Sequence, residues 1–164
     1  MHYYAILYYL QSLFINKSRF NFGMSSFLNG TGFMVKKETI DRYGYDPKTI
    51  TEDIEYTAIC AINGIKIAFN ENAITYDEQV TDFKSSLKQR KRWSFGTIQC
   101  LKNYTGSLIK EGIKNKRFEC FDVIIFYFGI IFHVLFTIVS LIGIFYNVFY
   151  QSWSKLYTGT FYEL

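Results

Sequence analysis

The chain has 164 residues, of which 49% are hydrophobic, 20% aromatic and 20% charged, and its net charge at pH 7 is +4. This composition, with a single proline, excludes a disordered or low-complexity chain. Its three cysteines are an odd number without a CxxC spacing, so they indicate neither a disulfide framework nor a zinc knuckle. The 14 tyrosines and 17 phenylalanines exceed what a small soluble core needs, and we expect an apolar environment beyond that core.

The amino-terminal residues 2–15, HYYAILYYLQSLFI, are almost all apolar. This stretch is shorter than the roughly 20 residues of a membrane-spanning helix. It also lacks the basic region and the small-residue cleavage site of a secretory signal. The pattern therefore predicts a buried or interfacial helix.

A strand, a helix and a loop are expected next. Residues 27–35 (FLNGTGFMV) end in a short apolar run that is typical of a strand. The following KKETIDRY is polar and helix-forming, and Gly44 is placed to end that helix. The segment YGYDPK then turns the chain.

A second helix and further strand structure follow. Thr49–Glu52 matches the S/T-x-x-E capping pattern, which predicts a helix from about Thr51 to Asn63 that ends at Gly64. Apolar and polar residues alternate over residues 65–70, which predicts a half-buried strand, and residues 73–76 extend it or pair with it. These alternating elements predict an α/β fold.

The positive charge is concentrated in one block. Residues 84–117 carry ten Lys or Arg and one Asp or Glu, whereas residues 1–83 carry seven and ten. The block is helical in character, and we expect an interfacial helix over about residues 80–118.

The most apolar stretch comes directly after this block. Residues 123–154 contain no Asp, Glu, Lys or Arg, and they predict one tilted transmembrane helix. Tyr146, Tyr150 and Trp153 form an aromatic belt at its far end. His133 within the span is either bonded to a neighbouring helix or part of a polar path.

Thr51-Glu52-Asp53 is the first group of chemical interest. A carboxylate at a helix start beside a cleft can serve as a general base that accepts a hydroxyl proton. The structural alternative is that Glu52, Asp53 and Glu55 complement the helix dipole. The tripeptide alone favours the structural alternative.

The second group is QRKRW, from Gln89 to Trp93, inside the basic helix. Spacings of three and four place Gln89, Arg92 and Trp93 on one face, where they combine an amide, a guanidinium for phosphate oxygens and an indole for a sugar ring. A basic helix with a tryptophan before a membrane span is equally typical of an interfacial anchor. Both interpretations stay open.

Asn29-Gly30-Thr31-Gly32 is the third group. Its glycines let a bulky ligand approach the backbone closely. It lacks the helix and the lysine of a phosphate loop, so it does not indicate a nucleotide cradle.

In this order, NGTGF, TED, QRKRW and a membrane span resemble the processive, membrane-embedded family 2 glycosyltransferases. That group includes cellulose, chitin and hyaluronan synthases and bacterial β-linked N-acetylglucosamine polymerases. The resemblance covers about residues 10–150, and the 36-residue interval from Asp53 to Gln89 is more specific than any single motif.

The resemblance implies a role for each motif. Asp53 would be the catalytic base that activates the acceptor hydroxyl, and Gln89 and Arg92 would face the nucleotide diphosphate. The residues that would bind the acceptor sugar are Trp93, Gly30, Thr31, Gly32 and Glu52.

The resemblance also implies parts that we do not find in the sequence. Family enzymes hold the uridine and a metal-bridged diphosphate with an amino-terminal half of the GT-A fold that carries an Asp-x-Asp motif. The 29 residues before Gly30 contain no Asp or Glu. We therefore expect the carboxy-terminal half of a GT-A domain, in an internal or carboxy-terminal fragment of a synthase. A divalent cation (Mg or Mn) is expected for the complete enzyme, with no metal ligand in this chain.

The expected organisation has three parts. Residues 1–118 form a partial catalytic domain, residues 119–154 the transmembrane helix and residues 155–164 a short extracytoplasmic tail. The basic block places the residues before 119 in the cytoplasm.

The expected activity is inverting transfer of a hexosyl unit, of glucose or N-acetylglucosamine type, from a nucleotide-diphosphate sugar to a growing β-linked polysaccharide. The expected partners are the sugar donor, the glycan acceptor, membrane lipid and a chain that carries the missing donor-binding half. The alternative is a non-catalytic membrane remnant or accessory subunit that binds anionic lipid or a partner through residues 84–117. Nucleic acid is not expected, because anionic lipid explains a basic block beside a membrane span.

Overall fold

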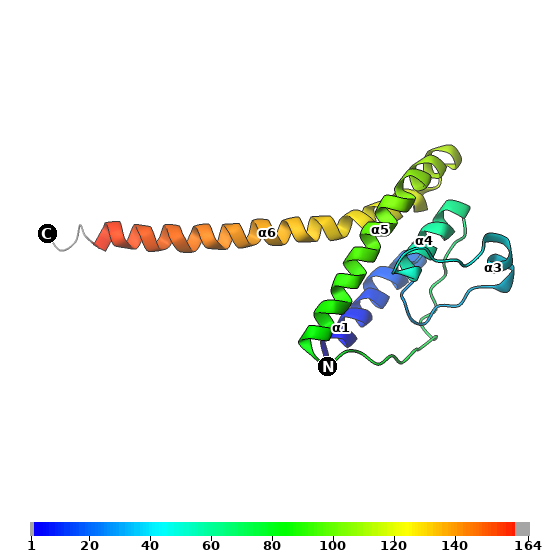
Figure 1. The fold of residues 1–164 in the computed structure, drawn as a ribbon, viewed down its shortest axis with the longest axis horizontal. Helices are drawn as coiled ribbons and strands as arrows, with labels where there is room; N and C mark the ends of the chain where they lie inside the picture. Colours follow the sequence, from blue (N-terminus) through cyan, green and yellow to red (C-terminus); the bar gives the residue numbers. More distant parts are fainter. Residues whose placement is uncertain (1, 160–164) are drawn as a thin grey trace. The chain divides into compact units, whose positions relative to one another are not determined.

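The computed structural model describes residues 2–159, with side chains except at residues 2, 3, 130 and 151–159. Internal contacts divide the chain into two units, Met1–Tyr127 and Phe128–Leu164. In chain order the elements are α1 (His2–Leu10), the π-helix η1 (Gln11–Lys17), α2 (Ser18–Asn21), α3 (Lys37–Tyr43), α4 (Glu52–Asn63), α5 (Phe83–Asn115) and α6 (Phe118–Gly159). Figure 1 labels α1, α3, α4, α5 and α6.

The predicted α/β fold, and with it the half GT-A domain, is wrong. In the part of the chain that the structure describes there are helices and no β-strand. The predicted strand segments, residues 27–35, 65–70 and 73–76, form neither helix nor strand, and residues 30–32 are a bend. Between the chain just before residue 27 and residues 65–70, one backbone bond is described, from the Ser26 N–H to the Ile67 carbonyl at 3.0 Å, and the Ile67 N–H donates to the Ser25 hydroxyl at 3.0 Å.

Polar side chains explain why these segments do not pair as strands. Asn16 Oδ1 accepts from the Phe27 N–H at 3.0 Å, and Thr57 Oγ1 accepts from the Leu28 N–H at 3.1 Å. An alternating pattern becomes a strand only where a neighbouring strand offers a ladder of hydrogen bonds. Here side chains from η1 and α4 accept from these donors in place of a neighbouring strand.

The predicted amino-terminal helix is confirmed, and it continues past its expected end at residue 15. α1 leads into the wider π-helical turns of η1 and then into α2, which ends at Asn21. Gln11, at the start of η1, donates from its amide to Asn29 Oδ1 at 2.8 Å. The helix is thereby joined to the turn that contains the glycines.

The helix ends that were predicted at glycines are confirmed. α3 ends at Gly44 (φ 76°), and α4 ends at Gly64, whose φ of 69° is left-handed. The predicted capping pattern at Thr49–Glu52 does not form. The N-cap residue is Thr51, whose side chain makes no capping hydrogen bond, and Thr49 Oγ1 donates to the Thr51 carbonyl at 3.2 Å.

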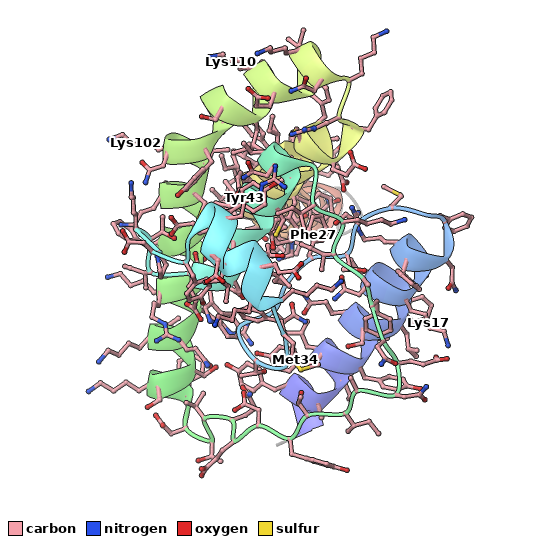
Figure 2. All side chains as sticks on the ribbon, turned by 90° about the vertical axis from the view of Figure 1, so that its right-hand side faces the viewer. Lys17, Phe27, Met34, Tyr43, Lys102 and Lys110 are labelled. Carbon is pink, nitrogen blue, oxygen red and sulfur yellow. The ribbon has the colours of Figure 1, made fainter. Side chains whose placement is uncertain are left out.

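The basic block forms one long helix, α5, as predicted. Asp82 caps it, because its carboxylate accepts the Ser85 N–H at 2.8 Å. Lys102 and Lys110 are exposed and point away from the helix (Figure 2).

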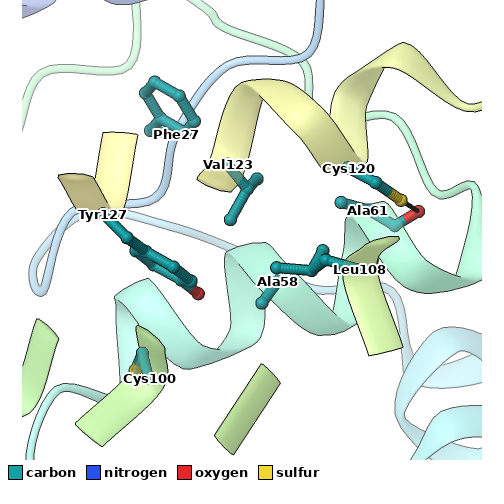
Figure 3. Packing of buried hydrophobic residues seen from close by; sticks show 8 residues of the cluster. All are labelled: Phe27, Ala58, Ala61, Cys100, Leu108, Cys120, Val123 and Tyr127. Carbon is teal, nitrogen blue, oxygen red and sulfur yellow. Dashed lines mark hydrogen bonds between the residues drawn. The ribbon is translucent and has the colours of Figure 1, made fainter. Parts of the chain in front are cut away.

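The core of the first unit lies where α4, α5 and the first turns of α6 meet (Figure 3). α4 and α5 pack very closely, since a Cβ added to Gly96 would lie 2.4 Å from Thr51 Oγ1. The Cys120 thiol donates to the Ala61 carbonyl at 3.4 Å. The buried apolar residues of this cluster are Phe27, Ala58, Ala61, Cys100, Leu108, Cys120, Val123 and Tyr127.

Two arginines join elements that are distant in the sequence. Arg19 of α2 forms an ion pair with Asp122, and its guanidinium lies 4.0 Å from the centre of the Phe27 ring. Arg117, between α5 and α6, donates to the Ile62 carbonyl near the end of α4. Both contacts lie within the first unit.

The second unit is the outer part of α6. The segment Phe118–Tyr150 is the one described helix long and apolar enough to cross a membrane. Beyond Tyr127 most of the large side chains of this segment are exposed, with Phe132 at 66%, Phe136 at 72% and Phe145 at 74%. A helix that is apolar on every side requires an apolar environment. The side chain of Trp153, which was expected in the aromatic belt, and residues 160–164 of the expected tail lie outside the described residues.

Candidate active site

Asp53 lies in the first turn of α4 and is half-buried. Gly30 faces it, since a Cβ added to Gly30 would lie 3.6 Å from Asp53 Oδ2. Burial raises the pKa of Asp53 above its ordinary value, and the negative charge of Glu52 adds to this effect. The Ile54 N–H and the positive charge of Arg92 partly oppose the rise. Asp53 is thus a carboxylate with a raised pKa, and it lies next to the exposed backbone of Gly30.

The glycine turn is held from two sides. Gly32 has a φ of 78°, and a Cβ there would lie 2.7 Å from Thr75 Oγ1, so both the backbone and the space require glycine. On the other side, Asn29 accepts the hydrogen bond from Gln11. This arrangement presents Gly30 to Asp53 and leaves Thr31 exposed.

The QRKRW motif lies in the first half of α5. Gln89 and Trp93 are half-buried, whereas Arg92 is exposed. Gln89 Oε1 is shielded from solvent and has no hydrogen-bond partner among the described residues. A buried amide oxygen without a partner costs free energy that a ligand donor would recover.

Trp93 contacts α1. The Tyr4 ring lies perpendicular to the indole, at an interplanar angle of 89° and a centroid distance of 6.4 Å. The Tyr4 hydroxyl shares a 2.6 Å hydrogen bond with the Ser86 hydroxyl. Tyr4 is buried at 6% exposure, so the first turns of α1 are docked against α5.

Tyr8 continues the same face of α1 toward Asp53. Burial raises the pKa of Tyr8, and the negative charges of Asp77 and Asp53 contribute to the rise. Tyr4 and Tyr8 of α1 and Gln11 of η1 follow the helical spacing of four and three residues and so share one face. Along this face Tyr4 contacts α5 and Gln11 bonds the glycine turn. The sequence predicts this helix only as buried or interfacial, and the spacing of Tyr4, Tyr8 and Gln11 is the signal that indicates its contacts.

Glu55 has a structural role that the sequence analysis did not predict. It is 1% exposed, and its carboxylate accepts the N–H groups of Lys48 at 2.9 Å and Thr49 at 2.7 Å as well as the Tyr104 hydroxyl. Burial by itself raises the pKa of Glu55, but these hydrogen bonds outweigh it and lower the pKa. Glu55 therefore holds the loop before α4 and joins α4 to α5, beyond any effect on the helix dipole.

The structure brings some of the predicted site residues together and leaves others apart. Gly30 lies against Asp53, and Arg92 acts on the Asp53 charge. Trp93 lies beside Tyr4 of α1. Glu52, next to Asp53 in the chain, also acts on the Asp53 charge, whereas no side-chain hydrogen bond or ion pair joins Thr31 to this group within the described residues.

Comparison with known proteins is consistent with a site for glycosyl transfer. A family model described as "Glycosyl transferase family group 2" matches residues 3–162. YdaM, a probable glycosyltransferase of Bacillus subtilis (strain 168), is 30% identical over 109 residues, which cover 62% of this chain and 26% of YdaM. The matched part of this chain therefore covers about a quarter of the length of YdaM. No solved structure matches. Because the family model covers nearly the whole sequence, the chain belongs to glycosyl transferase family group 2.

Proposed function

We propose that this chain takes part in inverting transfer of a hexosyl unit, of glucose or N-acetylglucosamine type, from a nucleotide-diphosphate sugar to a growing β-linked glycan at a membrane. A synthase of the cellulose, chitin or hyaluronan kind is the proposed type of protein. The observation that carries the proposal is the half-buried Asp53, whose pKa is raised and which lies against Gly30 under the influence of Arg92. The family supplies the class of reaction.

Asp53 is the general base in this proposal. Its carboxylate takes the proton of the acceptor hydroxyl while that oxygen forms a bond to the anomeric carbon of the donor sugar. The bond between the anomeric carbon and the diphosphate oxygen breaks in the same step, and its electron pair leaves with the diphosphate. Attack from the opposite side inverts the anomeric centre, so no covalent intermediate with the protein forms.

Residues of α5 act on the two substrates. The Arg92 guanidinium and the Gln89 amide stabilise the negative charge that gathers on the departing diphosphate. Trp93 supports the acceptor sugar through its indole. The remaining residues proposed on the acceptor side are Gly30, Thr31, Gly32 and Glu52.

We propose that the divalent cation of the complete enzyme takes its ligands from outside this chain. Among residues 2–159, leaving out the undescribed side chains, no group of three or more His, Cys, Asp or Glu is placed to hold a metal ion. The proposed steps therefore use only side chains of this chain. A partner chain that carries the donor-binding half remains part of the proposal.

The membrane context rests on two helices. α6 supplies the apolar segment, and the basic α5 comes directly before it in the sequence. We propose that residues 1–118 form the catalytic part on the cytoplasmic side, that residues 119–154 cross the bilayer and that residues 155–164 lie on the far side. Lipid head groups are the proposed anionic partner of α5.

The exposed, basic α5 favours a second candidate function, in which the chain is a non-catalytic membrane subunit. Binding of the donor sugar distinguishes the glycosyltransferase from the non-catalytic membrane subunit. Radiolabelled nucleotide sugars, with glucose and N-acetylglucosamine donors first, are incubated with membranes that contain the complete locus. Incorporation into polymer supports transfer, whereas lipid binding without donor binding supports the subunit.

The substitution Asp53→Asn tests the base. We expect transfer to fall about 10²- to 10⁴-fold, because the amide cannot take the proton. Asp46→Asn in the exposed loop before α4 is the matched control and should retain transfer. A folded Asp53→Asn protein with an unchanged transfer rate would remove Asp53 as the base.

A further inference from the structure

The first turn of α1 contacts the face of α5 that carries the QRKRW motif. Tyr4 touches three positions of α5 spaced by four and three residues. Its hydroxyl meets Ser86 at 2.6 Å, its ring lies 5.8 Å from the Arg90 guanidinium carbon, and its ring centre lies 6.4 Å from that of Trp93. Residues at this spacing share one helical face. Tyr4 therefore binds along the same side of α5 as Trp93.

Tyr4 and Trp93 form an edge-to-face pair, so Tyr4 does not cover the face of the indole ring. The two ring planes are perpendicular at 89°, so Tyr4 does not stack on Trp93. An edge-to-face pair fixes the orientation of both rings. The Tyr4 hydroxyl is hydrogen-bonded to Ser86, which lies one helical turn before Gln89. This bond fixes the orientation of the Tyr4 side chain.

We propose that Tyr4 is a positioning residue for the acceptor site, because it orients the Trp93 indole against which the acceptor sugar packs. This inference rests on the proposed function, in which Trp93 supports the acceptor. Tyr4 acts through Trp93 and touches neither the donor nor the reacting atoms. The expected effect is on the use of the acceptor, whereas donor hydrolysis is unchanged.

The fluorescence of Trp93 tests the contact itself. The chain has two tryptophans, so Trp153→Phe leaves Trp93 as the one reporter. In the membrane-reconstituted protein, Tyr4→Leu should shift the Trp93 emission to longer wavelength and increase its quenching by acrylamide. The matched control is Tyr9→Leu, because Tyr9 lies on the same helix at 64% exposure, and it should change neither. Unchanged Trp93 emission in Tyr4→Leu overturns the proposal.

Steady-state kinetics test the consequence for the reaction. Tyr4→Leu should raise the acceptor KM about 3- to 10-fold, the range of a single aromatic pair, and leave donor hydrolysis within about twofold of wild type. Tyr4→Phe and Ser86→Ala keep the ring but break the hydroxyl pair, and each should raise the acceptor KM about twofold. If Tyr4→Leu does not fold, these two variants carry the test, and a normal KM in both overturns the proposal.

A double-mutant comparison separates the positioning role from a general structural one. In a Trp93→Phe background the Tyr4→Leu change should have no further effect on the acceptor KM, because the indole it orients is absent. A Tyr4 effect that persists in that background, or an equal loss in donor hydrolysis, overturns the positioning role. A normal acceptor KM in Trp93→Phe alone contradicts the proposed acceptor role of Trp93 and, with it, that of Tyr4. A raised KM in Trp93→Phe with a normal KM in Tyr4→Leu overturns the role of Tyr4 only.

Discussion

Asp53 combines a proposed catalytic role with a cost in stability. Burial raises its pKa, so the folded chain binds the proton more tightly than the unfolded chain does. Stability therefore falls as the pH rises from the unfolded pKa through the folded pKa, and it stays lower above that value. The ionised form that a base requires is the form that the fold disfavours.

We expect Asp53→Asn to be as stable as wild type or more stable at pH 7, because the amide removes the buried charge. As the pH is lowered through the raised pKa, wild-type Asp53 becomes protonated, and the difference in stability between wild type and Asp53→Asn should shrink. Thermal unfolding of both proteins at pH 7 and near pH 4 measures this. A variant that is clearly less stable than wild type at pH 7 would show that the carboxylate stabilises the fold.

Packing between α4 and α5 sets the position of Asp53 relative to the QRKRW motif. Thr51, just before α4, occupies the space above Gly96. The buried carboxylate of Glu55 joins α4 both to the preceding loop and to Tyr104 of α5. Thr51 and Glu55 lie two residues before and two residues after Asp53, so their contacts with α5 fix the position of Asp53 relative to α5.

Gly96→Ala should destabilise the protein by about 1–3 kcal/mol, although alanine is the better helix former, because the new methyl group would lie 2.4 Å from Thr51 Oγ1. Gly106 of α5 is the matched control, since a Cβ there meets nothing within 4 Å. Gly106→Ala should stabilise the helix by roughly 0.5–1 kcal/mol. Denaturant unfolding measures both, and equal effects at the two glycines would contradict the close packing of α4 on α5.

Glu55→Ala should cost about 2–4 kcal/mol, because it leaves the donors of Lys48, Thr49 and Tyr104 without an acceptor. The lowered pKa means that the contribution of Glu55 is fully present above its unfolded pKa of about 4.5 and is lost as the pH falls through the still lower folded pKa. The difference in the free energy of unfolding between wild type and Glu55→Ala should therefore become smaller in that acidic range. Glu38→Ala in the exposed first turn of α3 is the control and should stay within about 0.5 kcal/mol. A gap that does not depend on pH would contradict the ionised hydrogen-bond network.

For the whole molecule, the division into two units follows the distribution of apolar surface. The first unit buries one cluster of apolar residues among its own elements. In the part of the second unit that the structure describes, the chain is one helix, and most of its large apolar side chains are exposed although Phe145 stacks on Phe149 and Tyr146 on Tyr150. Such a helix is stable where lipid or another protein surrounds it.

Leu135→Arg, near the middle of the apolar segment, should impair membrane integration. An arginine at the centre of a span costs about 2.5–3.5 kcal/mol on insertion scales. We expect the variant to move from the carbonate-resistant to the carbonate-extractable membrane fraction, whereas Leu135→Phe should behave as wild type. Carbonate resistance that is identical in all three proteins would argue against a span at this position.

The sequence determined the elements that depend on local chemistry. The glycines fixed the ends of α3 and α4, Asp82 fixed the start of α5, and the block without charges fixed the apolar part of α6. The glycines and Asp82 act on a few neighbouring residues, and the block without charges is continuous in the chain, so the sequence by itself carries all of these signals.

Tertiary structure alone decided the rest. The predicted strands did not form, and side chains accept backbone donors there instead: Asn16 and Thr57 accept from Phe27 and Leu28, and Ser25 accepts from Ile67. Glu55 serves as a buried hydrogen-bond acceptor, and α1 brings Tyr4 to Trp93. These partners are separated by many residues in the sequence, and a periodic pattern shows which side of a segment is buried but does not identify the group that it meets.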